Sequence, residues 1–444
     1  MLPPASGDDD VVVAPPPTEV AGRWSIVSPT SLLIILALIN FLNYVDRYVI
    51  GALNPFLQDK HLGLGLTSTQ IGWLSTAFMI VHSVASIPLG YLADRYLRKR
   101  LIAMGVGLWS IATALAGLAS TFSQIFVARA AVGIGEATYA PAASALISDR
   151  FDAALRARVL GIFQLGMVLG AAIGLVAGGL VAAWLGWRAA FLVVGIPGLV
   201  LAVLILFVYE ADPAARRRKS RAGSEGGIRL APGEGSWTAA AWITLAGILT
   251  TFFTGALGVW APTFILRSRF GGDPRFIGDV VASFGPLVVV AGVAGTLVGS
   301  YIADRLERLR PGAGRLYTIA IGVLISAPCA AVAFMSHGGP TIYVMLGIGV
   351  FFNVWYVGPI LAALHDVVPP RLRATVTGAY FFLIHALGDA VSPLVVGYID
   401  DWRHSLADGL LFATALMALA GVAALAAVPA SRRRAQLSRA SAAQ

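Results

Sequence analysis

Long apolar segments separated by short polar connections make up most of this chain. Twelve of them come close to or exceed the roughly 20 apolar residues that a helix needs to cross a bilayer. Backbone groups cannot stay unpaired in lipid, and the segments lack the alternation of barrel strands, so each is predicted to be a helix. The predicted spans are 31–57, 69–93, 100–120, 123–148, 157–184, 188–209, 237–266, 276–303, 315–336, 340–364, 373–398 and 405–429.

Basic residues gather in every second connection. The even-numbered connections and both tails hold most of the arginines, whereas the odd-numbered connections hold few. By the positive-inside rule this alternation places both termini in the cytoplasm. A miscounted helix would destroy the alternation, so the charges support the count of twelve.

The polar stretches also divide the chain. We expect a disordered cytoplasmic tail at 1–29, an N-terminal six-helix bundle at 30–209, a cytoplasmic linker at 210–236, a C-terminal six-helix bundle at 237–430 and a basic cytoplasmic tail at 431–444. The first tail is acidic and Pro-rich and lacks the basic start and short apolar core of a signal peptide. The linker is Arg-rich, which fits either a solvated tether or contact with anionic lipid headgroups.

Composition excludes a soluble protein. Of the 444 residues, 57% are hydrophobic and only 12% are charged, about half the usual charged fraction of soluble domains. The net charge of +9 does not indicate a nucleic-acid partner, because the basic residues are spread between apolar segments and form no single basic face. The single cysteine, Cys329, cannot form an internal disulfide.

A short motif is repeated in the two halves. The connection after the second span contains Gly90, Asp94, Arg95 and Arg98, and the connection after the eighth contains Ser300, Asp304 and Arg305. Arg156 and Gly161 in the fifth span also match Arg373 and Gly378 in the eleventh. Two repeated halves are common in secondary transporters, whose binding site lies between them.

The first copy, from Gly90 to Arg100, resembles the loop signature of the major facilitator superfamily. The resemblance implies an all-α, polytopic fold of two pseudo-symmetric six-helix bundles. It also implies a gate loop that holds the cytoplasmic side by contacting neighbouring helix ends. In the second copy Ser300 replaces the glycine and Glu307 enters the basic stretch, so we expect a weaker contact there. A simple basic topology signal is the alternative interpretation of the first copy.

Few ionisable residues lie inside the predicted spans, and such residues are costly in lipid and usually functional. The first span holds Asp46 and Arg47, and the fourth holds Arg129 and Glu136. Asn40, Asn43, Tyr44 and Arg47 share one helix face, whereas Asp46 is turned by about 100° from Arg47. Arg129 and Glu136 are about 10.5 Å apart along their helix, so each should find its partner on another helix. Asp46–Arg129 is the expected pair.

Burial and a nearby arginine shift a carboxyl pKa in opposite directions. The hypothesis is therefore proton coupling at Asp46 and Glu136, with Arg47 and Arg129 as partners of an anion or of these acids. A static network of buried ion pairs is the alternative. No cofactor other than protons is expected, and scattered histidines and acids on three helices do not suggest a metal site.

Two motifs narrow the resemblance. Residues 43–47 (Asn-Tyr-Val-Asp-Arg) look like the first-helix motif of spinster-type lipid transporters and of related organic-anion symporters, and residues 133–139 look spinster-like. The resemblance implies that Asp46 and Glu136 match proton-linked positions and that Arg47 and Arg129 match charged cavity positions. Asn43, Tyr44 and Tyr139 in these motifs are further substrate candidates. Known spinster cargoes include lysophospholipids and sphingoid phosphates, and the Arg- and Ala-rich composition suggests a bacterial inner membrane.

The second half offers uncharged and aromatic side chains where the first is charged. The secondary cavity candidates are His385, Asp389, Asn353, Tyr356, Trp260 and Tyr380, and Phe252, Phe253, Phe351, Phe352, Trp355, Phe381 and Phe382 add aromatic rings. A cavity that is charged on one wall and aromatic on the other would suit an amphiphile. Ordinary packing explains the aromatic residues equally well. His82 is more simply an interior histidine.

The pattern favours a proton-coupled carrier of an anionic amphiphile that works by alternating access. A symporter of small organic anions is the alternative within transport. A membrane enzyme or lipid sensor is the alternative from another class, but the chain has no phosphate-binding, zinc-binding or serine-nucleophile motif. We expect membrane lipids and a small amphiphile or organic anion as partners, no nucleic acid, and a monomer.

Overall fold

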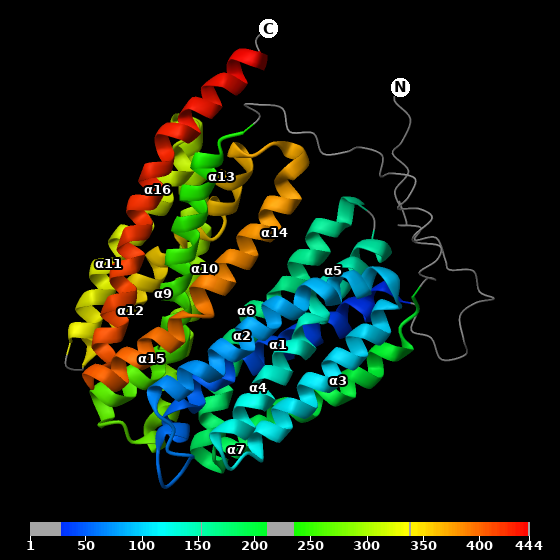
Figure 1. Cartoon of the computed structure of the whole chain (residues 1–444), viewed down its shortest axis with the longest axis vertical. Coiled ribbons are helices and arrows are strands. Elements are labelled where there is room, and N and C mark those ends of the chain that lie inside the picture. Colours follow the sequence, from blue (N-terminus) through cyan, green and yellow to red (C-terminus); the bar gives the residue numbers. More distant parts are fainter. Residues whose placement is uncertain (1–27, 152, 211–234, 337–338, 443–444) are drawn as a thin grey trace, which may run out of the picture.

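The computed structural model describes residues 28–151, 153–210, 235–336 and 339–442. These residues are almost entirely helical, and the helices form two bundles that lie side by side (Figure 1). The all-α, two-bundle fold predicted from the sequence is confirmed.

The first bundle contains seven helices and a short 3-10 turn. They are α1 (Pro29–Gln58), α2 (Ser68–Arg95), α3 (Arg98–Gly117), α4 (Phe122–Ala137), α5 (Tyr139–Arg150), α6 (Ala153–Leu185), α7 (Trp187–Leu204) and η1 (Ile205–Phe207).

The second bundle has more interruptions. Its elements are α9 (Trp237–Phe270), η2 (Pro274–Phe276), α10 (Ile277–Leu309), α11 (Gly314–Met335), α12 (Pro340–Asn353), η3 (Val354–Tyr356), α13 (Pro359–Val367), η4 (Pro370–Leu372), α14 (Arg373–Ile384), η5 (His385–Asp389), α15 (Ser392–Arg403) and α16 (Leu406–Ala442). The segment η5 is a π-helical turn, a feature often found at functional sites.

Eleven stretches within the described ranges are long and apolar enough to cross a membrane. The remaining predicted span, 123–148, is helical but is divided at Thr138 into α4 and α5. The span predicted at 340–364 is divided in the same way into α12, η3 and α13. The predicted tail at 1–29 and linker at 210–236 fall mostly outside the described residues. Residues 431–442 of the predicted basic tail continue α16.

Close backbone packing joins α1 to α6 along their length. A Cβ atom added to Gly166, Gly170 or Gly174 of α6 would come within 3.0 Å of backbone atoms of α1. Such small residues let helices approach closely without a side chain between them. This glycine stripe of α6 is therefore the surface that fixes α1, and with it Asp46 and Arg47, against α6.

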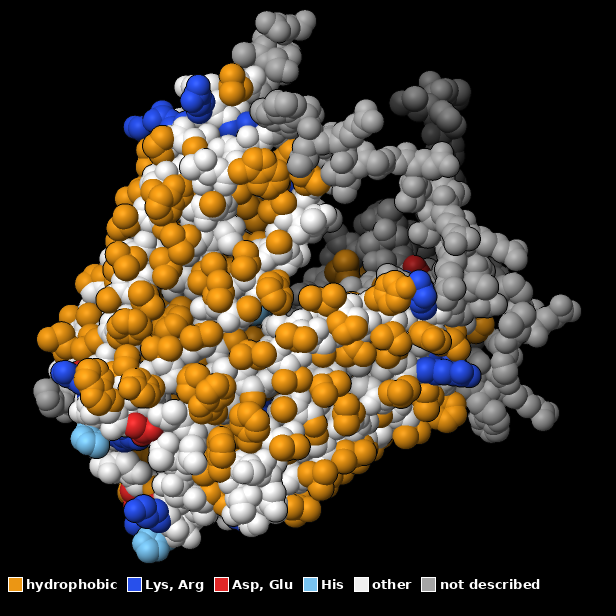
Figure 2. Space-filling model, in the orientation of Figure 1, with side chains coloured by type: hydrophobic (Ala, Val, Ile, Leu, Met, Phe, Trp, Pro, Cys, Tyr) orange, Lys and Arg blue, Asp and Glu red, His pale blue; other side chains and the backbone are white. Residues whose placement is uncertain are grey.

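Within the described residues, the largest area of apolar packing between the two halves lies at one end. The largest apolar cluster contains residues of both halves, including Leu53, Phe56, Trp260 and Phe264, whereas the other two clusters lie almost entirely within one half each. We call the end near Gln58, Ser68 and Asp400 the sealed end. At the opposite, open end a Cβ atom on Gly90, Gly161 or Gly378 would meet nothing within 4 Å, and Figure 2 shows a hollow between the halves there.

Candidate functional site

A buried ion pair joins α1 to α4 in the first half. Arg129 Nη1 lies 3.5 Å from Asp46 Oδ2, and both side chains are only 1% exposed. Thr113 of α3 donates a hydrogen bond of 2.9 Å to the other carboxylate oxygen of Asp46. The pairing of Asp46 with Arg129 predicted from helix geometry is confirmed.

A second ion pair lies beside the first. Arg47 Nη2 donates to Glu136 Oε2 at 2.9 Å, again between α1 and α4. The Glu136 side chain is fully buried, whereas the Arg47 side chain is 20% exposed. Because consecutive helical residues point about 100° apart, Asp46 faces the bundle interior while Arg47 keeps one edge accessible. Among these four charged side chains, Arg47 is the one that an arriving ion can reach.

Phe78 of α2 supports both arginines. The guanidinium of Arg47 lies over its ring at 5.1 Å from the centroid, and that of Arg129 at 5.0 Å. Cation–π contacts in a desolvated site are worth about 2 kcal/mol. Sequence analysis missed both Phe78 and Thr113. The only available signal was the position of Phe78, one helical turn before His82 on the same face.

The remaining first-half candidates have different surroundings. Tyr44 lies beside Arg47, with the guanidinium 5.1 Å from its ring centroid, and Asn43 is buried nearby on α1. The hydroxyl of Tyr139 donates to the carbonyl of Leu36, and Tyr139 is only 1% exposed. Tyr139 therefore ties α5 to α1 and does not reach the hollow, because its polar group is already paired inside the bundle.

In the second half, the π-turn η5 brings His385 and Asp389 together. Nδ1 of His385 lies 2.9 Å from Asp389 Oδ2, and the side chains are 40% and 23% exposed. Directly after η5, the carbonyl of Ala390 accepts a hydrogen bond of 2.5 Å from the hydroxyl of Thr76 on α2. The end of η5 is therefore joined to the first half.

A neutral hydrogen bond lies in the second half. The side-chain amide of Asn353, at the end of α12, donates to Thr254 Oγ1 of α9 at 3.0 Å. Tyr356 follows in η3 and is half-buried. The other two cavity candidates are packed away from the opening. Trp260 is fully buried and donates to the carbonyl of Pro393 at the sealed end, and Tyr380 is 3% exposed against Gly247.

Much of the expected aromatic wall is also packed inside the bundle. Phe252, Phe253 and Trp355 are buried, whereas Phe381 and Phe382 are exposed. Phe381 stacks on His385, with ring centroids 6.4 Å apart and planes inclined by 14°. The aromatic side chains closest to the second-half ionisable residues are therefore those of α14.

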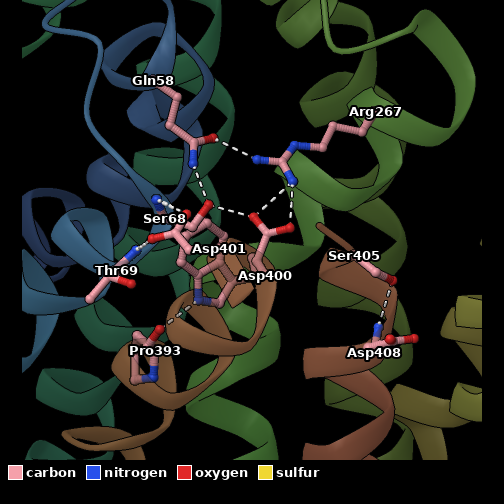
Figure 3. Close-up of polar contacts among 10 residues, drawn as sticks. Gln58, Ser68, Thr69, Arg267, Pro393, Asp400, Asp401, Ser405 and Asp408 are labelled. Atoms are coloured by element: carbon pink, nitrogen blue, oxygen red, sulfur yellow. Dashed lines mark hydrogen bonds and ion pairs between the residues drawn. The ribbon is translucent and has the colours of Figure 1, made fainter. Parts of the chain in front are cut away.

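A polar network that the sequence did not reveal closes the sealed end (Figure 3). Arg267 of α9 binds Asp400 of α15 at 2.8 Å, and Asp400 accepts a hydrogen bond from the hydroxyl of Ser68 at the start of α2. Asp401 accepts from the backbone N–H groups of Ser68 (3.0 Å) and Thr69 (2.7 Å). Carboxylates are favoured at helix N-termini, so this pair of aspartates holds the second half against the first.

Gln58 completes the sealed-end network. Its amide donates to Ser68 Oγ at 2.8 Å and its carbonyl accepts from Arg267 at 3.3 Å. Helices α1, α2, α9 and α15 are therefore joined at one place. Nearby, Arg403 pairs with Asp408 at 2.9 Å, but that contact lies within the second half.

The gate-loop residues lie at the open end. Arg98 binds Asp149 of α5 at 2.6 Å, and Arg95 lies over the ring of Tyr91. In the second copy Arg305 contacts Tyr301 on its own helix at 3.4 Å, and Asp304 is exposed. The side-chain environment of Asp94 is outside the described features. The expected contact with neighbouring helix ends is thus seen for Arg98.

The arrangement suits ion exchange better than bond chemistry. Within residues 28–151, 153–210, 235–336 and 339–442, no group of three or more His, Cys, Asp or Glu side chains is placed to hold a metal ion. Two arginine–carboxylate pairs at membrane depth can instead exchange partners with a proton or an anion.

Comparisons with known proteins agree with this geometry. The family model described as Major Facilitator Superfamily matches residues 36–393. The chain is 35% identical to protein spinster homolog 1 of Mus musculus, over 92% of this chain and 83% of the mouse protein. It is 34% identical to protein spinster homolog 1 of Homo sapiens, over 91% and 82%.

Solved structures show the same fold. A bacterial homolog of the human lysosomal transporter spinster, in an inward-facing and unoccupied conformation, has a TM-score of 0.72 at 21% identity, covering 92% of this chain and 97% of that one. A nucleoside transporter has a TM-score of 0.68 at 15% identity, covering 89% and 98%. The chain therefore belongs to the spinster family of the major facilitator superfamily and is a multi-pass membrane transporter, not an enzyme.

Proposed function

We propose that this chain is a proton-coupled secondary transporter that moves an anionic amphiphile, a lysolipid or related lipid, by alternating access. The observation that carries the proposal is the Arg47–Glu136 pair, in which the arginine has an accessible edge and the carboxylate is fully buried. Arginine cannot release its proton at physiological pH and binds carboxylates and phosphates through paired hydrogen bonds.

The pair links protons to the anion. A proton on Glu136 and an anionic group on Arg47 each replace one partner of the ion pair, so binding of either one favours binding of the other. The neighbouring Asp46–Arg129 pair, which is buried and bound to Thr113, is the second proton-linked pair of the proposal. Arg47 and Arg129 then serve as substrate and counter-ion partners, and Asn43 and Tyr44 shape the wall around Arg47.

The amphiphilic substrate is proposed because of the side chains in the second half and because of the similarity to spinster proteins. The second half carries the neutral Asn353–Thr254 contact and the exposed rings of Phe381 and Phe382 on α14, which can accompany the uncharged part of a lipid. One observation favours the alternative, a symporter of small organic anions. Trp260, Tyr380 and Phe253 are packed inside the second half, so fewer rings are available to bind a tail.

The proposal includes the orientation of the protein in the membrane and its oligomeric state. Both termini lie in the cytoplasm of a bacterial cell, the hollow opens inward, and the gate loops carrying Asp94 and Asp304 lie at the cytoplasmic face. The transporter works as a monomer among membrane lipids, uses protons as its coupling ion, and needs no other cofactor and no nucleic acid. The basic connections on that side support this orientation.

Transport assays in proteoliposomes test the proposal. Lysolipids and small organic anions are offered with and without a pH gradient, and uptake and proton flux are measured together. We expect lysolipid-dependent proton flux in the unmodified protein and a loss of at least about tenfold in Asp46→Asn and Glu136→Gln, the range that removal of one proton-transfer group produces.

The matched control is Asp408→Asn, which removes an exposed carboxylate of the second half and should leave proton flux unchanged. Unchanged coupling in both Asp46→Asn and Glu136→Gln would overturn the proton-linked role. Preference for small hydrophilic acids over lysolipids would favour the organic-anion alternative.

A further inference from the structure

The two halves share a register that identifies equivalent residues. The ion pair Arg98–Asp149 of the first half has a counterpart in the second half, Arg315–Asp366. Arg315 follows Arg98 by the same number of residues as Asp366 follows Asp149. The same shift carries Glu136 onto Asn353. Both residues also lie beside a helix interruption, between α4 and α5 and between α12 and η3.

The contacts follow the same symmetry. Glu136 binds Arg47 of α1, and Asn353 binds Thr254 of α9, the helix that begins the second half as α1 begins the first. Where the first half has an ion pair, the second half has a neutral hydrogen bond. Discontinuous helices in corresponding positions of two repeats are a recurring location of transporter binding sites.

Asn353 has one hydrogen-bonding group unused. Its amide nitrogen donates to Thr254, but its Oδ1 atom is buried without a protein partner among the described residues, and the residue is 2% exposed. A buried acceptor left unpaired is unfavourable, because it has lost its hydrogen bonds to water. The side chain is therefore poised to accept a hydrogen bond from a group that enters the site.

This part of α9 faces the first half. One residue after Thr254, a Cβ atom on Gly255 would contact Asp389, and one turn further a Cβ atom on Gly258 would lie 3.8 Å from the ring of Tyr48 on α1. Tyr48 directly follows Arg47 in α1 and is 36% exposed. Thr254, which Asn353 contacts, therefore lies one helical turn from the place where α9 approaches α1.

We propose that Asn353 is a specificity-determining residue that binds an uncharged hydroxyl or amide N–H of the substrate through Oδ1. This inference rests on the proposed function, in which Arg47 holds the acidic group. The substrate class is then narrower than an anionic amphiphile. It is an anionic lipid that carries a hydrogen-bond donor between its acidic group and its acyl chain, as the glycerol hydroxyl of a lysophospholipid does.

Paired lipid probes test the inference on the full-length protein in nanodiscs. One probe is lysophosphatidate, and the other is the matched lipid that lacks the glycerol hydroxyl. The dissociation constant of each is measured by titration calorimetry. The unmodified protein should bind the hydroxyl-bearing probe about tenfold more tightly, because a lost hydrogen bond to a buried acceptor is worth about 1.4 kcal/mol.

Two variants test whether Asn353 causes the preference for the hydroxyl-bearing probe. Asn353→Leu removes the acceptor at similar volume, and the two probes should then bind equally. Asn353→Asp keeps an acceptor oxygen in the same place and should retain the preference, which a purely structural role of the side chain would not explain. Retained discrimination in Asn353→Leu would overturn the assignment.

Binding of the two probes to the unmodified protein distinguishes failure of this inference from failure of the proposed function. Equal binding of both probes would overturn the role of Asn353 and leave the proposed function intact. Binding of neither probe would overturn the proposed lipid substrate together with this inference. Neither reading depends on whether a variant folds.

Discussion

The two halves have similar helix caps at their open ends, but they carry different charged side chains at their centres. At the start of α3 the carboxylate of Glu210 accepts from the N–H groups of Arg98 and Lys99, and at the start of α11 Glu307 accepts from those of Gly312 and Arg315. Each cap sits beside an equivalent Arg–Asp pair. The helix ends are alike because each bundle must satisfy free N–H groups there.

At the centre the two halves differ in buried charge. The first half holds two arginine–carboxylate pairs, whereas the second half has Leu346 at the position equivalent to Arg129 and Asn353 at that of Glu136. The common scaffold therefore does not require buried charge. We infer that the ion pairs are kept for function, because replacing a buried pair with apolar residues is often neutral or stabilising.

A second difference concerns helix packing. Gly166, Gly170, Gly174 and Gly178 let α6 approach α1 closely, whereas the equivalent positions in the second half are Leu383, Leu387, Val391 and Val395. There the close approach involves Gly247 and Gly255 of α9 together with Gly388 of η5. The equivalent helix is also broken by the π-turn η5. The first half is thus the more continuous support for its charged residues.

Replacing Arg129 should have the largest effect on stability. Arg129→Leu copies Leu346 of the second half but leaves the buried Asp46 carboxylate without its cation, which costs about 3–5 kcal/mol. Thermal unfolding in detergent should show a clear loss. The double variant Asp46→Ala/Arg129→Leu should recover most of it. A double variant as unstable as the single one would contradict the view that the scaffold tolerates an uncharged centre.

Breaking the sealed-end network should have the second-largest effect. Asp400→Asn weakens charge-assisted hydrogen bonds worth about 1.5–3 kcal/mol, which shifts a two-state equilibrium by about tenfold or more. With Cys329→Ala as background and Thr76→Cys as the probe, thiol labelling of purified protein should accelerate, because Thr76 is buried where α2 contacts Ala390 of the second half.

Asp408→Asn is the control for that experiment, since its ion pair lies near the same end but within one half. It should leave the labelling rate of the Thr76→Cys probe unchanged. Equal acceleration by both variants would show that the network around Asp400 does not hold the halves together.

Filling the glycine stripe should have a moderate effect. Gly170→Leu copies Leu387 and places a side chain where even a Cβ atom would lie 2.4 Å from the carbonyl oxygen of Phe41. Overpacking of this kind costs about 1–3 kcal/mol. The unfolding temperature should fall, whereas Gly161→Ala, with open space around its Cβ position, should leave it nearly unchanged. Similar results for both would mean that α6 does not depend on close approach to α1.

The smallest effect is expected where the halves are alike. Asp149→Asn and Asp366→Asn each weaken a partly exposed ion pair, and such pairs contribute about 1 kcal/mol or less. Both variants should lower the unfolding temperature slightly and to the same extent. A large loss in only one of them would show that the open ends are less equivalent than their contacts indicate.

The sequence predicted the architecture and the central residues well. Apolar segments and alternating basic connections are direct consequences of the bilayer, so the two bundles could be derived. Asp46, Arg47, Arg129 and Glu136 could be found because charged residues are rare in such segments. Helix geometry then selected the Asp46–Arg129 contact that the structure contains.

Other features give no distinctive signal. Phe78 and Thr113 are ordinary residues of apolar helices until the fold brings them to the ion pairs. Arg267, Asp400 and Asp401 lie at helix ends, where charge is common. Tyr139 is a substrate candidate through its place in the spinster-like motif, and Trp260 is a cavity candidate through its aromatic ring. A helix surrounded by neighbours has several buried faces, and the sequence does not say which one meets the opening.

The unequal exposure of Asp46, Arg47, Arg129 and Glu136 implies an order of events for a carrier of anions. A solute that diffuses in from the open end meets the accessible edge of Arg47 before it meets the carboxylate of Asp46 or Glu136, so this edge attracts anions until its charge is neutralised. Anion first, proton second is the sequence this placement favours, and pre-steady-state kinetics can distinguish it from the reverse.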